Sequence, residues 1–360
     1  MKSRLVFYFA IMVGMVFGAS VFVVSLLGFC FKLSLSTIGV ISCLVSSLAL
    51  SYIISDKVAD RTGSFSLKWV SGACLGSLSV AFSVSILGWG LIFFGAKPYE
   101  VGILSLVAIL SLSILGLFLN ARLPKVNSHQ LTLQKLTQPL RLVQLSDLHF
   151  NGLKTQAWTE KLVQEVNQLN PDYILFTGDF FDVATTHLKP HLQILKDLKA
   201  TKGKFAVSGN HDFYSGYRAY CSMMTEIGFT LMDNMSFSDD ALCLIGLPDQ
   251  QGRSEGVKRL SLDELIPASK QALPIVLLDH RPQEAKRALK KGVDLQLSGH
   301  THKGQIPPWN VLVRLRYRYS AGLYKKNQSY VFTSIGTGSW GPPMRLFSRS
   351  EIVCLDLVGS

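Results

Sequence analysis

Two histidines separated by one residue follow an apolar stretch in the C-terminal part of the chain. His300 and His302 come soon after the run 293–297. Side chains two positions apart on extended backbone point to the same side, so both imidazoles can reach one small volume. Taken alone, such a pair is more often a chance surface arrangement. Its interest here is that the chain repeats the pattern.

An apolar run followed at once by metal-binding residue types recurs along the chain. The runs alternate with helical patterns, which is typical of an α/β sheet covered on both faces. Ligands of such sheets bind beyond the carboxyl ends of the strands, so we expect the following residues to converge on one cleft. They are Asp147 and His149 after the run 142–145, Asp179 after 173–176, Asn210, His211 and Asp212 after 205–207, and His280 after 275–278.

The periodicity of apolar residues predicts the elements that carry these side chains. Expected strands are 141–145, 173–176, 205–208, 241–247, 275–278, 293–297, 330–335 and 352–357. Expected helices are 155–170, 190–198, 217–227 and 282–291, the last beginning with a proline and ending before a glycine.

The converging side chains form a set of two carboxylates, one amide and four imidazoles. These are Asp147, His149, Asp179, Asn210, His280, His300 and His302. The set exceeds the four ligands of one zinc ion but suits two divalent ions, with Asp179 able to bridge them through its two oxygens. Nitrogen and oxygen donors without thiolate favour Mn, Fe or Zn over Mg or Ca. Such a pair stabilises an in-line displacement and lowers the pKa of a water.

The remaining histidines and two nearby aspartates are not part of this ligand set. His211 is not needed as a ligand and could give a proton to a leaving oxygen or stabilise charged oxygens, with Asp212 orienting it. Asp182 is either a support of the site or part of a local turn. His129, His187 and His191 lie outside the motifs and are expected at the surface.

The five motifs together resemble the calcineurin-like metallophosphoesterase superfamily. The resemblance covers about residues 140–358, and all five motifs occur in the family's order. It implies a sandwich of mixed β-sheets flanked by helices and a metal pair, with His211 as the catalytic histidine. The implied ligands are Asp147, His149, Asp179 and His302 for one ion, and Asp179, Asn210, His280 and His300 for the other.

Two longer runs resemble the bacterial, membrane-associated YaeI/YkuE-type phosphodiesterase branch of that superfamily. They are 297–305 (LSGHTHKGQ) and 336–345 (GTGSWGPPMR). The chain departs from the branch at Lys303, where glycine is usual, and in the run Asp279-His280-Arg281-Pro282. Neither departure removes a ligand. Arg281, Lys303 and Arg345 are the residues that we expect to contact substrate.

The front third of the chain has a different composition. The chain is 48% hydrophobic and 17% charged, but residues 1–120 hold only seven Lys or Arg and three Asp or Glu. Four charge-poor runs, 5–31, 33–55, 69–96 and 101–121, are each long enough to cross a bilayer. A signal peptide is the alternative for the first run. We expect a four-helix transmembrane anchor over 1–122, a linker over 123–139 and the phosphoesterase domain over 140–360.

Basic residues suggest the orientation of these spans. Lys2 and Arg4 precede the first run, and Lys57, Arg61 and Lys68 separate the second from the third. Only Lys32 and Lys97 lie in the other two turns. The positive-inside rule then places both termini, and with them the phosphoesterase domain, in the cytoplasm. For a chain of the bacterial branch this means a multi-pass protein of the inner membrane.

Charge and cysteine content limit the partners. The net charge of +12 comes without a nucleic-acid motif, so no nucleic acid is expected and anionic lipid is at least as good a partner. Six cysteines without a C-x-x-C pair indicate neither disulfides nor a thiolate zinc site. Arg314, Arg316 and Arg318 alternate with apolar residues as on a strand. That face is either solvated or set against anionic lipid or substrate phosphate.

The sequence thus favours a membrane-anchored phosphohydrolase with two metal ions. The expected bond is a phosphodiester or pyrophosphate, of a lipid-linked substrate such as UDP-2,3-diacylglucosamine, which some similar members hydrolyse. One alternative is a phosphodiesterase for soluble or cyclic nucleotides. Another is a non-catalytic membrane receptor or scaffold, which would be expected to lack ligands, and none is missing.

Overall fold

The computed structural model describes residues 2–182, 187–266 and 272–359. The chain forms two compact units. The helical unit comprises residues 1–122, 305–311 and 341–347. The sheet unit comprises residues 123–304, 312–340 and 348–360. Two short segments of the expected phosphoesterase domain are therefore built into the helical unit.

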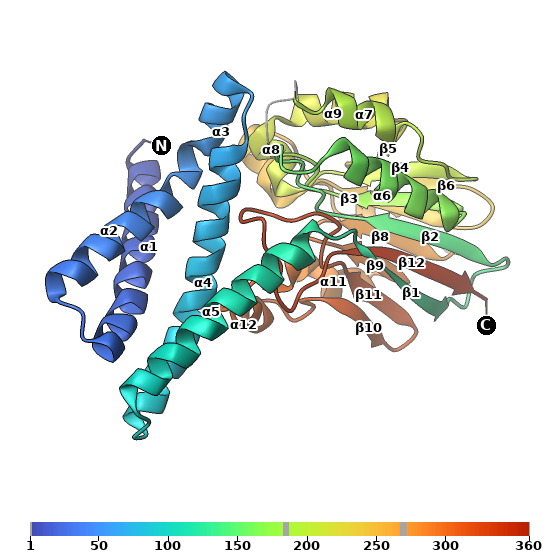
Figure 1. Ribbon diagram of the computed structural model, residues 1–360. Helices are drawn as coiled ribbons and strands as arrows, with labels where there is room; N and C mark the ends of the chain where they lie inside the picture. The colour runs from blue at the N-terminus through green and yellow to red at the C-terminus, as the bar shows by residue number, and fades with distance from the viewer. Residues whose placement is uncertain (1, 183–186, 267–271, 360) are drawn as a thin grey trace. The chain divides into compact units, whose positions relative to one another are not determined.

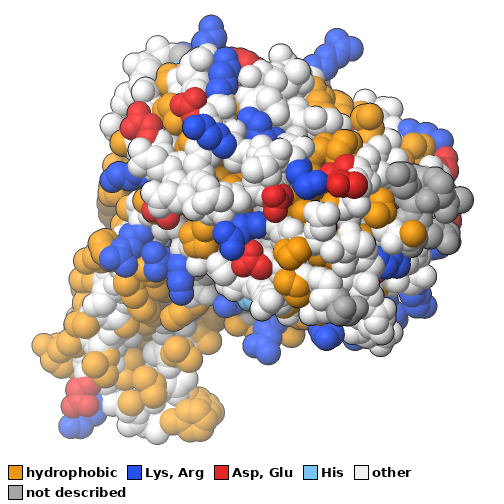
Figure 2. Space-filling view, turned by 90° about the vertical axis from the view of Figure 1, so that its right-hand side faces the viewer, with side chains coloured by type: hydrophobic (Ala, Val, Ile, Leu, Met, Phe, Trp, Pro, Cys, Tyr) orange, Lys and Arg blue, Asp and Glu red, His pale blue; other side chains and the backbone are white. Residues whose placement is uncertain are grey.

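Five helices make up most of the helical unit, coloured blue to green in Figure 1. They are α1 (Lys2–Phe31), α2 (Leu35–Leu50), α3 (Tyr52–Thr62), α4 (Ser66–Phe93) and α5 (Pro98–Ala121). Within the described residues, α1, α4 and α5 are long and apolar enough to cross a membrane. Hydrophobic side chains dominate the surface of the α4–α5 hairpin, seen at the lower left of Figure 2.

The second expected span, 33–55, is not one straight helix. It is divided between α2 and α3, which meet at a bend of 42° and reach the length of a span only when taken together. Ser51 lies at the break, where its hydroxyl donates to the carbonyl of Leu48 and competes with the helical hydrogen bonds. Beyond it, Asp56 forms an ion pair with the buried Lys68 of α4. The expectation of four spans is thus met only if the bent pair is one of them.

Two six-stranded sheets form the sheet unit. The first has the order β1-β12-β2-β3-β4-β5 and the second β10-β11-β9-β8-β7-β6. The first consists of β1 (Lys125–Thr132), β2 (Leu140–Leu145), β3 (Tyr173–Thr177), β4 (Gly203–Val207), β5 (Thr230–Leu231) and β12 (Glu351–Val358). The second consists of β6 (Met235–Ser238), β7 (Cys243–Leu247), β8 (Ile275–Asp279), β9 (Leu295–Ser298), β10 (Gly322–Lys326) and β11 (Ser329–Thr333).

Shorter helices connect the strands. Figure 1 shows α6, α7 and α9 together on one side of the first sheet. The helices are α6 (Gln156–Gln168), α7 (Lys189–Leu195), α8 (Asn210–Ser215), α9 (Tyr217–Glu226), α10 (Leu262–Leu265), α11 (Ala285–Lys290) and α12 (Trp309–Arg316), with 3₁₀ turns η2 (Gln250–Glu255), η4 (Pro282–Glu284) and η5 (His302–Gly304).

One apolar cluster joins the two sheets. Leu142, Leu175 and Val207 of the first sheet and Leu278 and Phe332 of the second belong to it, each at most 1% exposed. β3, β7 and β8 are buried along their whole length, which explains their unbroken apolar sequences. Both sheets contain parallel and antiparallel pairs, so the expected sandwich of mixed sheets with flanking helices is confirmed.

Two local expectations are wrong. Residues 125–132 of the expected linker form β1, paired in parallel with β12 from Lys125↔Glu351 to Thr132↔Val358. β1 is an edge strand with mostly polar, accessible residues, so it lacks the apolar signal of an inner strand. The stretch 314–318 is not a strand, because α12 continues through Arg316. The alternating pattern there was too short to separate the two periods.

Candidate metal centre

All seven expected ligands lie in the sheet unit, directly after strands. Asp147 and His149 follow β2, and Asp179 follows β3. Asn210 is the first residue of α8, just after β4. The remaining three, His280, His300 and His302, follow β8 and β9. The strand ends therefore bring together residues that are up to 155 positions apart (147 to 302).

Asp147, His149 and His302 form the first ligand group, and all three are buried. His302 Nε2 lies 3.3 Å from Asp147 Oδ1. His149 Nε2 lies 3.1 Å from His302 Nε2 and 3.9 Å from Asp147 Oδ1. One carboxylate oxygen and two imidazole nitrogens thus face a common point.

Asp179, His280 and His300 form the second group. His280 Nε2 lies 3.2 Å from Asp179 Oδ2. The same oxygen is 3.5 Å from His149 Nε2 of the first group. Asp179 is therefore the residue that reaches both groups, as a bridging ligand would.

Two buried polar atoms at this cluster make no hydrogen bond within the described residues. They are Asn210 Oδ1, and His280 Nε2, which lies 3.2 Å from Asp179 Oδ2 without the geometry of a hydrogen bond. Leaving such atoms unpaired costs about 1–3 kcal/mol each, so a buried orphan calls for an explanation. A cation supplies one, because both atoms are electron-pair donors of the type that Mn, Fe and Zn accept. The residues present fit a metal pair.

Hydrogen bonds on the far side of two rings fix their orientation. His280 Nδ1 is 2.7 Å from the carbonyl oxygen of Thr177 and can only donate to it. His149 Nδ1 is 3.0 Å from Asp182 Oδ2. Each contact places the proton on Nδ1 and leaves the Nε2 lone pair facing the cluster, which is the usual support of a metal-binding histidine.

The backbone at the ligands is held in an uncommon conformation. Asp147, His149, Asp179, His300 and His302 all have positive φ, between 44° and 69°. Non-glycine residues adopt this region rarely, and clusters of such residues mark functional sites. Gly299 also lets the Asp147 carboxylate lie close to the backbone of the loop that carries His300, since a Cβ at position 299 would overlap that carboxylate.

Charge at the centre suits cation binding. Burial alone would raise the pKa of Asp147, but His302 beside it holds that pKa below its usual range. The same balance, with His280 as the partner, lowers the pKa of Asp179. Burial lowers the pKa of His300 to about 3, which favours the neutral imidazole that a ligand needs. Burial opposes protonation of His280, but Asp179 beside it raises the pKa of His280 to about 10, so a metal ion would take the place of that proton.

His211 differs from the other histidines of the cluster. Its side chain is 20% exposed, whereas those of His149 and His280 are at most 1% exposed. Its Nδ1 lies 2.8 Å from Asp182 Oδ1, and the Trp340 ring lies 6.0 Å away. Burial opposes protonation, but Asp182 and Asp179 raise the pKa of His211 to about 9. The imidazole of His211 is thus partly accessible, and its raised pKa favours the protonated form.

The expected partner of His211 is wrong. Asp212 does not contact the His211 ring; it accepts the backbone N–H groups of Gly209, Asp179 and Phe180 at 2.7–2.9 Å. Asp212 thus holds two ligand loops together, and Asp182 orients His211. From the sequence, Asp182 was either a support of the site or part of a local turn. Its hydrogen bonds to His149 and His211 show that it supports the histidines of the site.

The three expected substrate contacts have different surroundings. Lys303 is exposed and follows His302. Arg281 is tied to Asp249, with Nε 2.6 Å from Oδ2. Arg345 is fully buried in the helical unit. One contact was missed by sequence reasoning: the Tyr317 hydroxyl lies 3.1 Å from His300 Nε2. Tyr317 lies in a stretch interpreted as a strand, where no motif marks it.

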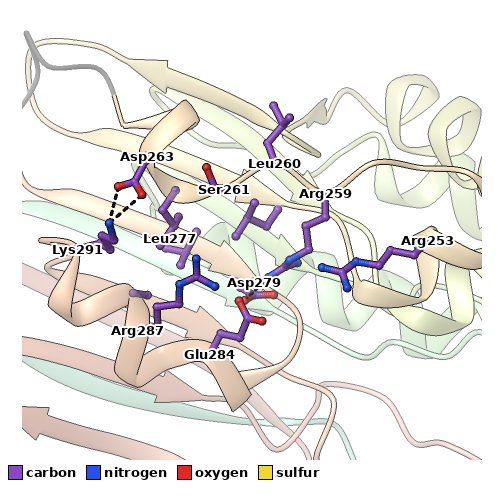
Figure 3. Close-up of a pocket in the computed structure, with 13 residues that line it drawn as sticks. Arg253, Arg259, Leu260, Ser261, Asp263, Leu277, Asp279, Glu284, Arg287 and Lys291 are labelled. Carbon is purple, nitrogen blue, oxygen red and sulfur yellow. Dashed lines mark hydrogen bonds and ion pairs between the residues drawn. The ribbon is translucent and has the colours of Figure 1, made fainter.

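A separate cavity of about 190 Å³ lies beside β8 and contains none of the expected ligands (Figure 3). Asp279 lines it and pairs with the buried Arg259 at 2.8 Å. Lys291 pairs with Asp263 at 2.8 Å on the opposite wall. Neighbouring strand residues point to opposite faces, so Asp279 lines this cavity while His280 belongs to the metal cluster.

Comparisons with known proteins agree with this geometry. The family model described as calcineurin-like phosphoesterase matches residues 140–304. The Bacillus subtilis uncharacterized metallophosphoesterase YkuE is 32% identical over 237 residues, which are 60% of this chain and 78% of that protein. The chain therefore belongs to the calcineurin-like metallophosphoesterase family, in agreement with its motifs and its resemblance to the YkuE-type bacterial branch.

Two further relatives extend the comparison. An uncharacterized metallophosphoesterase of Helicobacter pylori is 35% identical over 238 residues, 65% of this chain and 64% of that protein. A transmembrane protein with metallophosphoesterase domain from Danio rerio is 32% identical over 271 residues, 71% of this chain and 62% of that protein. The chain thus spans less than two thirds of the length of these two relatives.

Proposed function

We propose that the protein is a membrane-anchored phosphohydrolase that uses two divalent metal ions to cleave a phosphodiester or pyrophosphate bond. The observation that carries this proposal is the position of Asp179. Its Oδ2 lies 3.2 Å from His280 Nε2 in one ligand group and 3.5 Å from His149 Nε2 in the other. Two ligand groups with one carboxylate in reach of both are the arrangement that two-metal hydrolysis requires.

The side chains of this site have distinct tasks. When bound, the metal pair supplies an activated water and offsets negative charge on the phosphoryl oxygens. Mn, Fe or Zn suits the donor set. His211 holds a proton that it can pass to the leaving oxygen, and Asp182 keeps that ring in position. Trp340, which is 53% exposed, offers an apolar surface next to His211.

The proposed substrate is lipid-linked, with UDP-2,3-diacylglucosamine as one example. Support comes from the chain path. The segment 305–311 begins three residues after His302, and 341–347 begins directly after Trp340, yet both belong to the helical unit. The Pro307 carbonyl accepts from Ser79 of α4 at 2.6 Å, and Arg345 N–H donates to Gly116 of α5 at 2.9 Å. A soluble or cyclic nucleotide is the alternative, with the helices serving only as an anchor.

Replacing Asp179 tests the two-metal assignment. Asp179→Ala removes the one carboxylate near both groups, so metal content and hydrolysis of an aryl phosphodiester should fall together. Asp240→Ala, which alters an exposed carboxylate, is the matched control and should keep both. Full metal content and turnover in Asp179→Ala would rule out the bridging role.

A substrate pair tests the lipid assignment. Each buried CH₂ group contributes about 0.8 kcal/mol, so acyl chains that enter an apolar surface should raise kcat/KM by a large factor. The measurement compares UDP-2,3-diacylglucosamine with its deacylated analogue on the full-length protein in mixed micelles. Equal kcat/KM values for the two compounds would favour the soluble-nucleotide alternative.

A further inference from the structure

Helix α12 carries an apolar face that no part of the described chain covers. Trp309, Val311, Leu312 and Leu315 are 50%, 60%, 48% and 79% exposed, and none of the helix residues is buried. Residues three and four positions apart lie close together on a helix, so Val311, Leu312 and Leu315 share one side, and Trp309 lies further round the same side, beyond Arg316. Exposed faces of this kind mark binding surfaces rather than ordinary solvent-facing helices.

Basic side chains accompany this face. Arg314, Arg316 and Arg318 are all exposed, and none has an ion-pair partner among the described residues. Arg314 lies across the helix from the apolar face, Arg316 lies on the side of that face at the last residue of the helix, and Arg318 follows the helix. Positive charge beside an apolar, tryptophan-containing face is the pattern of a helix that lies in a membrane interface.

The start of α12 is continuous with the helical unit. Ile306 shares an apolar cluster with Val80 of α4 and with Met344 and Leu346. The Pro307 carbonyl, two residues before the helix, accepts the Ser79 hydroxyl near the middle of α4. α4 is one of the helices long and apolar enough to cross a membrane. The segment that leads into α12 is therefore packed against a helix that we place in lipid.

We propose that α12 lies in the interfacial layer of an anionic bilayer, with Trp309, Val311, Leu312 and Leu315 facing the acyl chains and the three arginines facing lipid phosphates. Charge complementarity selects this occupant, because basic residues are attracted to the phosphates of an anionic membrane surface. A neutral protein partner or a second copy would leave these charges without opposite charge.

This placement also gives the proposed lipid substrate a position. Tyr317, the residue directly after α12, has its hydroxyl 3.1 Å from His300 Nε2. A headgroup held at the end of α12 would then lie beside a candidate ligand of the metal centre. This step rests on the proposed function, whereas the membrane contact of α12 does not require hydrolysis.

Site-specific labelling of the full-length protein in proteoliposomes tests the contact. Cys43, Cys74 and Cys221, which are exposed or half-buried, are first replaced by alanine. An environment-sensitive fluorophore is then attached at Leu315→Cys. We expect blue-shifted emission, loss of most of the intensity with brominated lipid, and little quenching by aqueous iodide.

Two matched positions separate the possible failures. Leu104→Cys on α5, 64% exposed, reports on the proposed spanning helices, and Met235→Cys on β6, 52% exposed, reports on the aqueous surface. If the label at 104 is quenched by brominated lipid but that at 315 behaves like that at 235, the proposal for α12 is wrong and the anchor stands. If the label at 104 also escapes brominated lipid, the anchor itself is wrong.

The arginines supply a second readout. Replacing Arg314, Arg316 and Arg318 by glutamine should weaken the lipid quenching at position 315 in vesicles that contain anionic lipid, and should change little in neutral vesicles. Blue-shifted emission that brominated lipid leaves unquenched would show a protein contact, such as a second copy, and would overturn the proposal. If the wild-type arginines and their glutamine replacements gave equal quenching in both anionic and neutral vesicles, the proposed role of charge would be wrong.

Discussion

At the scale of single residues, His211 is the side chain whose role is most sharply testable. Its Nδ1 is held by Asp182 and its ring is partly exposed, so we expect it to move a proton rather than bind metal. His211→Ala should keep the metal content and lose rate by about 10²–10⁴-fold, the usual contribution of a general acid. Because His211 also lies near His149 and Asp179, metal loss in this variant would identify it as a ligand instead.

Asp182 should behave differently, because it supports two histidines at once. It lies 3.0 Å from His149 Nδ1 and 2.8 Å from His211 Nδ1. Asp182→Asn should therefore lower both turnover and metal affinity, the latter by about 10–100-fold, as is usual for a partner of a metal ligand. Metal titration by calorimetry alongside His211→Ala separates the two effects. Unchanged metal affinity would restrict Asp182 to orienting His211.

His191 was expected at the surface but is buried, and this makes stability depend on pH. Its ring packs 4.8 Å from Phe150, and its Nδ1 lies 2.8 Å from the Thr159 hydroxyl. Burial lowers the pKa of His191 below the ordinary value of 6.5. Since the folded state then disfavours the proton, this contribution to stability is present above about pH 6.5 and is lost as the pH falls.

The measurement is the thermal midpoint of the detergent-solubilised protein between pH 7.5 and 5. Wild type should lose more on acidification than His191→Asn, which cannot titrate. Parallel curves for the two proteins would mean that the buried ring does not influence acid stability.

At the scale of elements, the inner strands were predictable and the edges were not. β3 and β8 are buried on both faces and read as unbroken apolar runs. β1 has no such run, because only its pairing with β12 makes it a strand. α12 was not predicted either. None of its residues is buried, so its sequence lacks the regular spacing of core-facing apolar residues by which a helix is recognised.

The same difference holds for the site. The candidate ligands were named from local motifs after strands, because each motif carries its own residue types. Asp182 and Tyr317 act through neighbours that the fold alone brings near: Asp182 meets His149, 33 positions away, and Tyr317 meets His300. Contacts made by side chains at such separations leave no spacing rule in the sequence.

Substitution of glycines in the helical unit tests how segment 341–347 packs against α5. A Cβ at Gly116 of α5 would lie 2.6 Å from Met344 Cγ, whereas at Gly90 of α4 it would meet nothing within 4 Å. Gly116→Val should therefore destabilise the protein by about 1–3 kcal/mol, the usual cost of overpacking, and Gly90→Val should not. Thermal midpoints in one detergent compare them. Adding Met344→Ala should restore part of the loss; no recovery would mean that the clash lies elsewhere.

At the scale of the whole molecule, the break between α2 and α3 decides on which side of the membrane the sheet unit lies. If the bent pair crosses, the chain has four spans and both ends share one side. If it dips in and returns, α1, α4 and α5 give three spans and the ends lie on opposite sides. Basic residues favour the first arrangement. It collects Lys2, Arg4, Lys57, Arg61 and Arg122 on one side and leaves only Lys32 and Lys97 on the other.

Four crossings therefore predict that both termini face the cytoplasm. Reporters active only in the cytoplasm should work when fused to either end of the full chain, and reporters active only outside should be silent at both. The charge bias itself can be tested: Lys57→Gln with Arg61→Gln lowers the cytoplasmic excess between the second and third spans and should make the topology mixed, while Lys97→Gln should sharpen it. A C-terminal reporter active only outside, with the N-terminus in the cytoplasm, would show that α2 and α3 form a re-entrant hairpin and that the metal centre faces the opposite compartment.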